Sequence, residues 1–350
     1  MATIKYKGVG IRAMSACVPK NVVYNKDLGY LIPEDEIEKT IKSIGIEERR
    51  IADADVCASD LCYKAALKLF EDNNIDPSSI DALIFVSQTP DYHMPATAPL
   101  LQHKLGLSTS TLSFDVNLAC SGYVYGLNIA YALASQQGIN NVLLLDGETM
   151  SKIVSKNDKE STALFGDAGT ATLISKGEFG DAVFSLYSDG SGSDVMKVFY
   201  GGYRNLSSAE GFKDKTDDKG SIRNGEQFYM DGMETFNFGL RVEPKSIKKI
   251  VADAGLEIND LDLIIYHQAN KFMTDFFTKR LKFDVNKTPY SLGKYGNTSS
   301  ASIPLTIVSE LKDGYPSRSK VLLSGFGAGL SWGSVILDLS KVEISRLLEY

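Results

Sequence analysis

A cysteine between an expected strand and an expected helix is the first group in this chain that could carry chemistry. Cys120 lies within Val116-Asn-Leu-Ala-Cys-Ser-Gly-Tyr123, and an apolar helical stripe follows as far as Ala134. The unpaired N–H groups at the beginning of a helix favour a thiolate over a thiol, which is the form that a nucleophile needs. We therefore expect Cys120 to be a nucleophile, although an isolated cysteine among small residues is more often a small buried side chain.

Two further polar side chains and one glycine-rich loop follow expected strands or turns later in the chain. His267 closes the strand Leu263–Tyr266, and Asn297 lies in a glycine-flanked turn before a small-residue helix. The loop Gly325–Gly333 could bring bare backbone to a substrate and donate an N–H group to an oxyanion. Taken singly, each has an ordinary structural explanation: a buried histidine with a satisfied hydrogen bond, a helix cap and a tight turn.

An internal repeat explains how these residues could meet. The segment Ala66–Val86 runs from a helix through an acidic turn into a buried strand, and Ile247–Tyr266 repeats this order. Further along, residues 113–145 correspond to residues 289–323 at nearly the same offset. Helices that alternate with short apolar strands favour a mixed α/β sheet covered by helices. Two copies of one α/β unit would pack about a pseudo-twofold axis and bring their strand ends together.

The repeat predicts two halves, residues 1–185 with the cysteine and residues 186–350 with the histidine and the asparagine. The second half would begin with a long connection over residues 186–232, which is rich in Gly, Ser, Asp and Lys. One interpretation is a solvated linker. The other is that its aromatic pairs, Phe199–Tyr200 and Phe228–Tyr229, fold over a pocket, because long loops in compact domains are often functional.

Composition and charge exclude several classes of protein. The 350 residues include 37 Lys plus Arg against 44 Asp plus Glu, and the net charge of −7 opposes binding to a nucleic-acid backbone. No apolar run is long enough to cross a membrane, and no secretory signal is recognisable, so we expect a cytoplasmic protein. The four cysteines are too few for a disulfide framework, and the three histidines lie outside any metal-ligand spacing.

Five ordered motifs resemble the thiolase-like condensing enzymes, specifically the β-ketoacyl-acyl-carrier-protein synthase III group. They are Ala119–Gly122, Phe165–Asp167, His267–Asn270, Tyr295–Ser299 and Gly325–Gly329, within a match that covers essentially the whole chain. The resemblance implies an α/β fold of five layers, αβαβα, built from two duplicated halves with pseudo-twofold symmetry. It also implies a Cys-His-Asn site, acyl-coenzyme A or acyl-carrier thioester substrates, no metal or other cofactor, and a homodimer.

The resemblance assigns a role to each site residue. Cys120 would be acylated from a thioester, with the N–H groups of Cys120 and Ala328 binding the tetrahedral oxyanion. His267 and Asn297 would then donate hydrogen bonds to a malonyl thioester as it loses CO2 and becomes an enolate. The enolate would attack the acyl group on Cys120 and give a β-ketoacyl product, while Phe326 shields the reaction from water.

The acyl pocket and the carrier surface are assigned in the same way. Asn270 would line the substrate pocket, and Met94 lies in a loop that crosses the dimer interface in this family and touches the partner's acyl pocket. A basic face on this acidic chain would receive the acyl carrier protein. Its residues would be Lys248, Lys249, Lys271, Lys279, Arg280 and Lys282, and ordinary solvated helix faces explain them equally well. On that last helix we interpret the apolar stripe as core; it comprises Phe272, Met273, Phe276, Phe277 and Leu281.

Departures from the family pattern leave the primer and the pathway open. Lys39 and Ser43 stand where members that use acyl-coenzyme A usually carry a Trp and an Arg. Phe272 stands where an Arg is common, whereas Lys159 keeps a cation where another Arg is usual. Fatty acid biosynthesis, polyketide assembly and surface-polysaccharide modification all fit such a chain.

Three other functions compete with condensation. An acyltransferase of the same fold would move the acyl group from Cys120 to a hydroxyl or amine of a sugar or natural-product intermediate. Retention of both His267 and Asn297 favours condensation, because plain acyl transfer needs no paired enolate site. A papain-like thiol protease shares the order Cys, His, Asn but has a different cysteine motif. A non-catalytic scaffold would be expected to lose one of the three residues.

Overall fold

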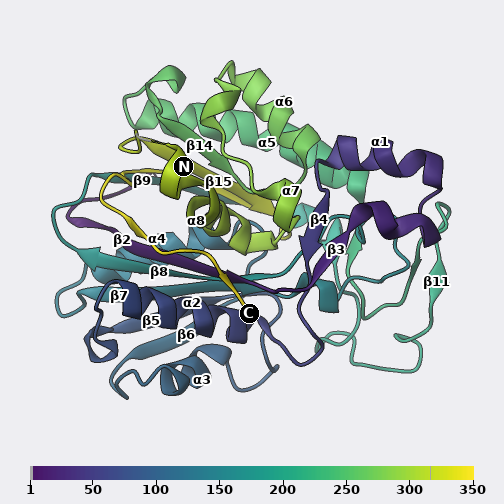
Figure 1. The fold of residues 1–350 in the computed structure, drawn as a ribbon, viewed down its shortest axis with the longest axis horizontal. Coiled ribbons are helices and arrows are strands. Elements are labelled where there is room, and N and C mark those ends of the chain that lie inside the picture. Colours follow the sequence, from purple (N-terminus) through teal and green to yellow (C-terminus); the bar gives the residue numbers. More distant parts are fainter. Residues whose placement is uncertain (1–2, 316) are drawn as a thin grey trace.

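The computed structural model describes residues 3–315 and 317–350, and two mixed β-sheets organise the chain (Figure 1). The seven-stranded sheet has the order β17 (Glu343–Ile344), β2 (Val9–Val18), β8 (Ala168–Lys176), β7 (Asn141–Glu148), β5 (Ala82–Val86) and β6 (Leu112–Val116), with β18 (Leu348–Glu349) also beside β2. The five-stranded sheet has the order β1 (Ile4–Tyr6), β9 (Ala182–Ser188), β16 (Ser331–Leu337), β15 (Val321–Gly327) and β14 (Leu263–Tyr266).

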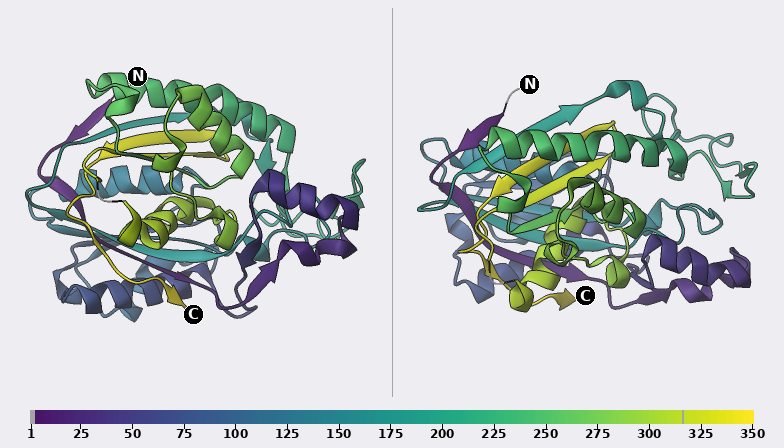
Figure 2. Two further views of the ribbon diagram at one scale, coloured as in Figure 1. Left: turned by 45° about the horizontal axis from the view of Figure 1, so that its top comes forward. Right: turned by 90° about the horizontal axis from the view of Figure 1, so that it is seen from above.

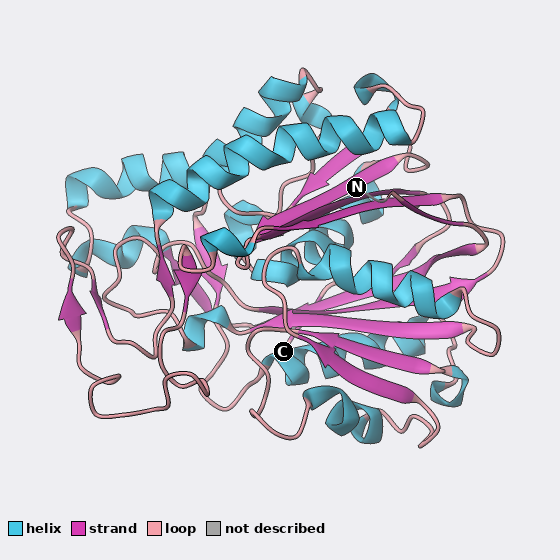
Figure 3. Cartoon of the chain, turned by 180° about the vertical axis from the view of Figure 1, so that it is seen from behind, coloured by secondary structure: helices cyan, strands magenta, loops and turns pink. Residues whose placement is uncertain are grey.

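Helices cover both sheets on both faces, which gives five layers (Figure 3). Helices α2 (Ala58–Asp72) and α3 (Thr97–Lys104) lie on the outer face of the larger sheet, and α4 (Gly122–Ala134) and α8 (Ser302–Gly314) lie between the sheets. Helices α5 (Gly232–Asp253) and α6 (Lys271–Leu281) form the outer layer on the smaller sheet. Because both faces are covered, every residue of β5 and β14 is buried, as their continuous apolar sequences predict.

The two sheets share one connection pattern. β5 pairs in parallel with β7, and β7 pairs antiparallel with β8; β14, β15 and β16 repeat this arrangement. Short 3-10 turns, Pro77–Ser79 and Ile258–Asp260, lead into β5 and β14. The repeat breaks at one place, since residues 112–116 form the edge strand β6 whereas the described residues 289–291 form no strand.

The two halves exchange strands at their ends. The boundary expected after residue 185 falls inside β9, which belongs to the smaller sheet. β1 also joins this smaller sheet, although it lies in the first half of the chain. β17 and β18, from the second half, join the larger sheet beside β2.

A lobe of short elements projects beyond one end of the two sheets (Figure 2). It contains the 3-10 helix Asn25–Tyr30, α1 (Glu34–Ile44), β3 (Val22–Tyr24) and β4 (Glu48–Arg50), together with four strands of the long connection: β10 (Met196–Lys197), β11 (Lys215–Thr216), β12 (Ile222–Arg223) and β13 (Tyr229–Met230). The remaining elements are α7 (Leu292–Tyr295) and the 3-10 turns Met150–Lys152, Gly190–Gly192, Val285–Lys287 and Ser299–Ala301. None of the helices in residues 3–315 and 317–350 is long and apolar enough to cross a membrane.

Candidate active site

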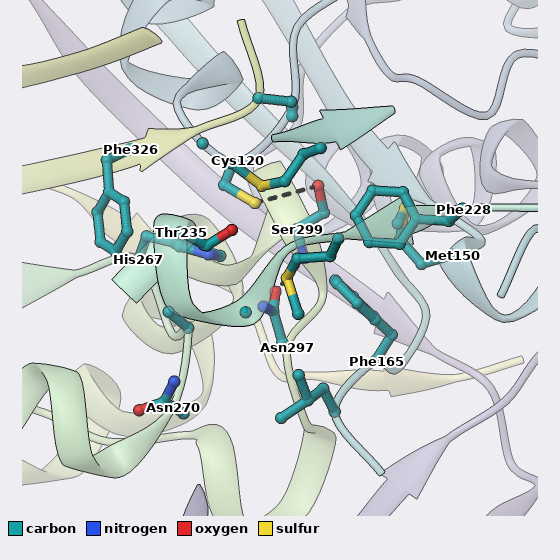
Figure 4. Close-up of a pocket in the computed structure, with 18 of the residues that line it drawn as sticks. Cys120, Met150, Phe165, Phe228, Thr235, His267, Asn270, Asn297, Ser299 and Phe326 are labelled. Atoms are coloured by element: carbon teal, nitrogen blue, oxygen red, sulfur yellow. Dashed lines mark hydrogen bonds between the residues drawn. The ribbon is translucent and has the colours of Figure 1, made fainter. Parts of the chain in front are cut away.

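A cavity of about 270 Å³ lies between the ends of the two sheets and the projecting lobe (Figure 4). Six residues assigned from the sequence line it together: Cys120, His267, Asn270, Asn297, Phe326 and Ala328. Much of the remaining wall is apolar and comes from Met150, Phe165, Met196, Phe228, Met230 and Met273. The structure therefore brings the cysteine of one half and the histidine and asparagine of the other to one enclosed space.

Cys120 is held by the close approach of β15 from the other half. A Cβ atom added at Gly327 would lie 2.9 Å from the Cβ atom of Cys120, and one added at Gly325 would lie 2.8 Å from its carbonyl oxygen. Both distances are shorter than real Cβ contacts allow, so these two positions need glycine for a steric reason. This explains part of the glycine-rich loop that the sequence singles out.

The pKa of the Cys120 thiol is affected by more than the position of the residue before a helix. Helix α4 begins at Gly122, two residues after the cysteine. Although the residue keeps intermediate exposure through the cavity, burial raises the pKa of the thiol to about 12. The Ser299 hydroxyl lowers it in part, and the Glu148 carboxyl raises it further. Burial of the sulfur thus opposes the thiolate form that the position before a helix is expected to favour.

His267 is a neutral side chain with one nitrogen already occupied. Its Nδ1 lies 2.7 Å from the hydroxyl oxygen of Ser302, which also accepts a hydrogen bond from the Gln268 N–H at 3.2 Å. The Ser302 hydrogen is then free to donate to Nδ1, which favours the tautomer with hydrogen on Nε2. Burial lowers the pKa of His267 to about 3, so the ring stays uncharged near neutral pH.

Asn297 is oriented by the residue two positions later. Its Oδ1 accepts a hydrogen bond from the Ser299 N–H at 2.9 Å, and its backbone N–H donates to the Leu164 carbonyl at 2.8 Å. With the carbonyl oxygen of the side chain engaged, the amide NH2 group remains as a donor toward the cavity. Ser299 has a φ angle of 52°, an uncommon left-handed conformation for a residue other than glycine.

The other residues assigned from the sequence lie in different surroundings. Phe326 packs edge-on against the His267 ring, with 5.8 Å between the ring centroids. The Asn270 side chain caps α6 by accepting a hydrogen bond from the Met273 N–H. Met94 is 82% exposed and does not line the cavity of its own chain. An exposed Met94 agrees with a role in a partner's pocket, which stays a prediction.

The expected carrier surface is partly neutralised by ion pairs. Lys249 pairs with Asp253 and Lys271 pairs with Asp275 within their own helices, whereas Lys248, Lys279, Arg280 and Lys282 are exposed. One part of the stripe interpreted as core is wrong. Phe272 is 55% exposed and contacts Phe236 near the cavity, because the first turn of α6 extends beyond the layer that buries Phe277.

The long connection contributes to the cavity, but only through part of its aromatic residues. Phe228 and the neighbouring Met230 line the wall, together with Met196 from the start of the connection. Phe199 and Tyr200 lie outside this cavity. Of the two interpretations of residues 186–232, the fold-over pocket therefore holds for Phe228 but not for Tyr229, which lies beside Phe199 and Tyr200 outside the cavity. The exposed linker holds for the stretch around Tyr203, which is 83% exposed.

Two groups of importance were not identified from the sequence. Ser299 lies in the motif that supplies Asn297, and its hydroxyl is 3.7 Å from the Cys120 sulfur. Asp146 and Glu148 lie directly beneath, fully buried at the end of β7. A usable signal was present, because the apolar run Val142–Leu145 is followed by Asp146 and, after one glycine, by Glu148. Among the residues that the structure describes, no group of three or more His, Cys, Asp or Glu side chains is arranged to hold a metal ion.

Comparisons with known proteins agree with this arrangement. Residues 114–190 match the family described as 3-oxoacyl-[acyl-carrier-protein] synthase III, and residues 251–339 match its C-terminal part. The chain is 36% identical over 336 residues to the β-ketoacyl-[acyl-carrier-protein] synthase III of Clostridium acetobutylicum, covering 95% of this chain and 99% of the relative. The corresponding protein of Fusobacterium nucleatum is 34% identical over the same length, with 95% and 98% covered.

Solved structures extend the likeness to the fold. The 3-oxoacyl-(acyl-carrier protein) synthase of Burkholderia xenovorans superimposes with a TM-score of 0.93 at 37% identity, covering 100% of this chain and 99% of the other. The synthase III of Thermus thermophilus gives a TM-score of 0.81 at 33% identity, with 94% and 98% covered. The thiolase-like fold predicted from the five motifs is thus confirmed, and the chain belongs to the β-ketoacyl-[acyl-carrier-protein] synthase III family.

Proposed function

We propose that this chain is an acyltransferase that forms β-ketoacyl thioesters in two half-reactions. Cys120 takes an acyl group from a thioester, and the acyl group then condenses with a malonyl thioester that loses CO2. The observation that carries the proposal is the cavity itself, which one cysteine and two neutral hydrogen-bond donors line together. Relatives over nearly the whole chain are named for this same class of synthase, which supports it.

In the first half-reaction the Cys120 sulfur attacks the thioester carbonyl. The carbonyl oxygen becomes negatively charged in the tetrahedral intermediate, and backbone N–H groups that point at it lower the barrier. We assign this task to the N–H groups of Cys120 and Ala328, because β15 holds its glycine-rich end against the cysteine. The apolar wall around Met150 and Phe165 suits an acyl chain.

In the second half-reaction a negative charge appears on the thioester oxygen of the malonyl group as CO2 leaves. His267 and Asn297 serve as donors to that oxygen, and their orientation before the substrate arrives is what makes them effective. A neutral imidazole suits this role because it donates a hydrogen bond without binding the substrate carboxylate as an ion pair. Burial lowers the pKa of His267 to about 3, which favours the neutral ring near pH 7. Phe326, against the imidazole ring, excludes water from the enolate.

The partners follow from the same chemistry. The relatives' names include an acyl carrier protein, which supports a carrier thioester as one substrate. We assign the exposed cations of α5 and α6 to its recognition and the exposed Met94 loop to a second copy of the chain in a homodimer. The reaction as proposed needs no metal and no organic cofactor, and we place it in the cytoplasm. Transfer of the acyl group to a hydroxyl or amine is not supported, because the relatives are named for condensation.

Product analysis tests the proposal directly. The wild-type protein is incubated with an acyl thioester and then with malonyl-acyl carrier protein, and the adduct mass, released CO2 and β-ketoacyl product are measured. We expect one acyl adduct, absent in Cys120→Ala, and one CO2 for each product molecule. An adduct that persists in Cys120→Ala, or an acylated enzyme that passes its acyl group to alcohols without CO2 release, would refute the proposal. Cys57→Ala, which alters a half-buried cysteine outside the cavity, is the matched control.

A further inference from the structure

Two carboxyl groups are buried beneath the cysteine, and the proposed half-reactions do not use them. Asp146 and Glu148 come from the end of β7, and both side chains are fully buried. Neither forms an ion pair within residues 3–315 and 317–350. Burial of an unpaired carboxylate is expensive, which makes two such groups beside the proposed nucleophile candidates for a role in its chemistry.

Glu148 is held in place by hydrogen-bond donors on both of its oxygens. Oε1 accepts from the Gln88 N–H at 3.0 Å, and Oε2 accepts from the Thr89 hydroxyl at 2.8 Å and the Ser87 hydroxyl at 3.3 Å. These donors all come from the segment that follows β5. Donors of this kind stabilise the charged form of a carboxyl group, so Glu148 is built to carry a negative charge for part of its working cycle.

One hydroxyl connects this carboxyl to the nucleophile. The Ser299 Oγ lies 3.7 Å from the Cys120 sulfur, the contact drawn as a dashed line in Figure 4, and 3.5 Å from Glu148 Oε1. The left-handed backbone of Ser299 aims its hydroxyl between the two groups while its N–H still holds Asn297. Both hydroxyl distances are long for hydrogen bonds, and contacts of this kind commonly tighten when substrate binds.

Asp146 has a different partner and a different state. The Ser300 hydroxyl donates to its Oδ1 at 2.6 Å, whereas the buried Oδ2 has no hydrogen-bond partner. Burial raises the pKa of Asp146 well above its usual range, and the neighbouring Glu148 raises it further. Burial therefore favours the neutral form of Asp146, whereas the donors on both oxygens of Glu148 favour its charged form.

The cavity offers two groups that could take the proton of the thiol. Burial lowers the pKa of His267 to about 3, which makes it a poor base. Burial raises the pKa of Glu148 to about 7, against the opposing effect of its donors, which places it where proton transfer near neutral pH is most efficient. The comparison favours the carboxyl group that the Ser299 hydroxyl reaches.

We propose that Glu148 receives the proton of Cys120 through the Ser299 hydroxyl during acylation and returns it when condensation releases the cysteine. This inference rests on the proposed function, since it describes how that function's nucleophile is switched on. It gives Ser299 and Glu148 a role in the first half-reaction that is separate from the task of His267 and Asn297 in the second.

The proposed steps balance over one cycle. In acylation the S–H bond of Cys120 breaks, its proton goes to the Ser299 oxygen, and the Ser299 proton goes to Glu148. The sulfur forms a bond to the acyl carbon, and the bond from that carbon to the leaving thiolate breaks; this thiolate takes a proton from solvent. In condensation the malonyl group releases CO2, its enolate carbon attacks the acyl group, and Cys120 leaves as a thiolate. Glu148 then returns its proton through Ser299, which restores the thiol and the carboxylate.

A proton relay through Glu148 can be distinguished from a purely electrostatic effect of its negative charge on the Cys120 thiol. The titratable groups that face the pair are Cys120 from the loop before α4, Cys62 from α2, Tyr123 from α4 and the adjacent Asp146. The carboxyl charge itself raises the pKa of the Cys120 thiol. If Glu148 acted only through its charge, Glu148→Gln would make the thiol more acidic and speed acylation. A relay predicts the opposite sign.

The test is the single-turnover rate of Cys120 acylation, followed by rapid quench and intact mass in excess acyl-coenzyme A or acyl-carrier thioester. We expect Glu148→Gln to slow acylation by about 100-fold, at the lower end of the usual range for loss of general-base catalysis, and Ser299→Ala to slow it by about 10-fold or more. The wild-type rate should rise with pH as Glu148 ionises near its pKa of about 7, and this inflection should be absent in Glu148→Gln. Glu148→Asp, which keeps a carboxyl group, should retain it.

Matched variants separate a relay from a damaged site. Ser121→Ala removes a buried hydroxyl beside Cys120 that bonds to Ser331 and has no contact with Glu148, so it should acylate at nearly the wild-type rate. Malonyl decarboxylation should stay within a few-fold of wild type in Ser299→Ala, because alanine keeps the N–H group that orients Asn297. If Glu148→Gln loses both half-reactions through misfolding, Ser299→Ala decides the question. Acylation by Ser299→Ala at the wild-type rate or faster would overturn the relay.

These outcomes are distinct from failure of the proposed function. A wild-type protein that forms no acyl adduct and releases no CO2 refutes the function itself. A wild-type protein that does both, with relay variants that acylate normally, refutes only the relay.

Discussion

The two halves carry side chains of different chemical character at equivalent positions of their strands. In the larger sheet Val86 pairs with Asp146, and in the smaller sheet Tyr266 pairs with Ser324 at the corresponding point. Two residues further on, Glu148 and Phe326 therefore occupy equivalent positions. Where the first half buries a carboxyl group beside the nucleophile, the second half places an aromatic ring beside the imidazole.

The same contrast holds at the neighbouring strands. The chain continues from β5 as Ser87-Gln88, which supplies donors to Glu148, and from β14 as His267-Gln268, which includes the donor that we propose for the substrate. In the reaction that we propose, the first half would handle the proton of the nucleophile, and the second half would offer uncharged donors to a transient oxyanion. Duplication provides two identical backbones, and the division of the reaction depends on which side chains stand at the strand ends.

The largest effects should separate the halves by function. We expect His267→Ala and Asn297→Ala to slow malonyl decarboxylation by about 100-fold to 1,000-fold, the usual loss for one oriented donor to an oxyanion. Self-acylation of Cys120 should stay within a few-fold of wild type. Cys120→Ala should show the reverse pattern, with no acylation and measurable decarboxylation. Parallel assays of adduct mass and CO2 release check this; equal loss of both activities in His267→Ala would point to His267 as the base for the thiol.

The next effect concerns the place where the halves touch. A methyl group at Gly327 would lie 2.9 Å from the Cβ of Cys120, so Gly327→Ala must displace the nucleophile or the strand. We expect acylation to slow by about 10-fold or more and the free energy of unfolding to fall by about 1–3 kcal/mol, as for other overpacked positions. Gly190→Ala, where an added Cβ meets nothing within 4 Å, is the control. Urea unfolding and single-turnover acylation measure both; a fully active Gly327→Ala would contradict this close packing.

His267 in the second half and Glu148 in the first half should contribute to the stability of the chain with opposite dependences on pH. The pKa of His267 falls from 6.5 to about 3 on folding, so its contribution to stability is present above pH 6.5 and is lost as the pH falls. The pKa of Glu148 rises from 4.5 to about 7, so its contribution is present below pH 4.5 and is lost as the pH rises toward 7. Each changes the free energy of unfolding by at most about 1.4 kcal/mol per pH unit.

Neutral replacements isolate these two contributions. Between about pH 5 and about pH 7, Glu148→Gln should gain stability relative to wild type as the pH rises, and His267→Gln should gain it as the pH falls. Chemical denaturation at several pH values measures the difference for each variant. If the free energy of unfolding of each variant changed with pH in the same way as that of the wild type, Glu148 and His267 would not titrate as their burial requires.

The smallest effect should appear on the outer helices. α6 follows β14 as α3 follows β5, and each carries basic residues in its last turn. If only the second half receives the carrier, Lys279→Ala with Arg280→Ala should raise the KM for the acyl carrier protein by a few-fold, and added salt should reduce this difference. Lys104→Ala in α3 should leave that KM unchanged. An equal change in both variants would remove the assignment to α6.

The sequence predicted the elements well and their mutual effects poorly. Apolar runs marked β5, β7 and β14, and the repeat of their order correctly indicated that Cys120, His267 and Asn297 would meet. The pKa of the Cys120 thiol could not be predicted from the sequence, because it depends on burial and on the charge of Glu148. Glu148 is distant from Cys120 in the sequence but close to it in the folded chain. The outward position of Phe272 likewise depends on where the layer beneath α6 ends, which periodicity does not encode.

The exchange of β1, β17 and β18 between the sheets also determines how the molecule comes apart. Each sheet contains at least one strand from the other half of the chain. Hydrogen bonds between these strands therefore hold the halves together in addition to the covalent connection over residues 186–232. A protease cut in the exposed stretch between Tyr203 and Leu206 should leave two fragments that stay associated and elute as one species in gel filtration. The interlocked strands, and not the covalent link alone, therefore hold the two halves together around the cavity, while the long connection supplies Phe228 and Met230 to its wall.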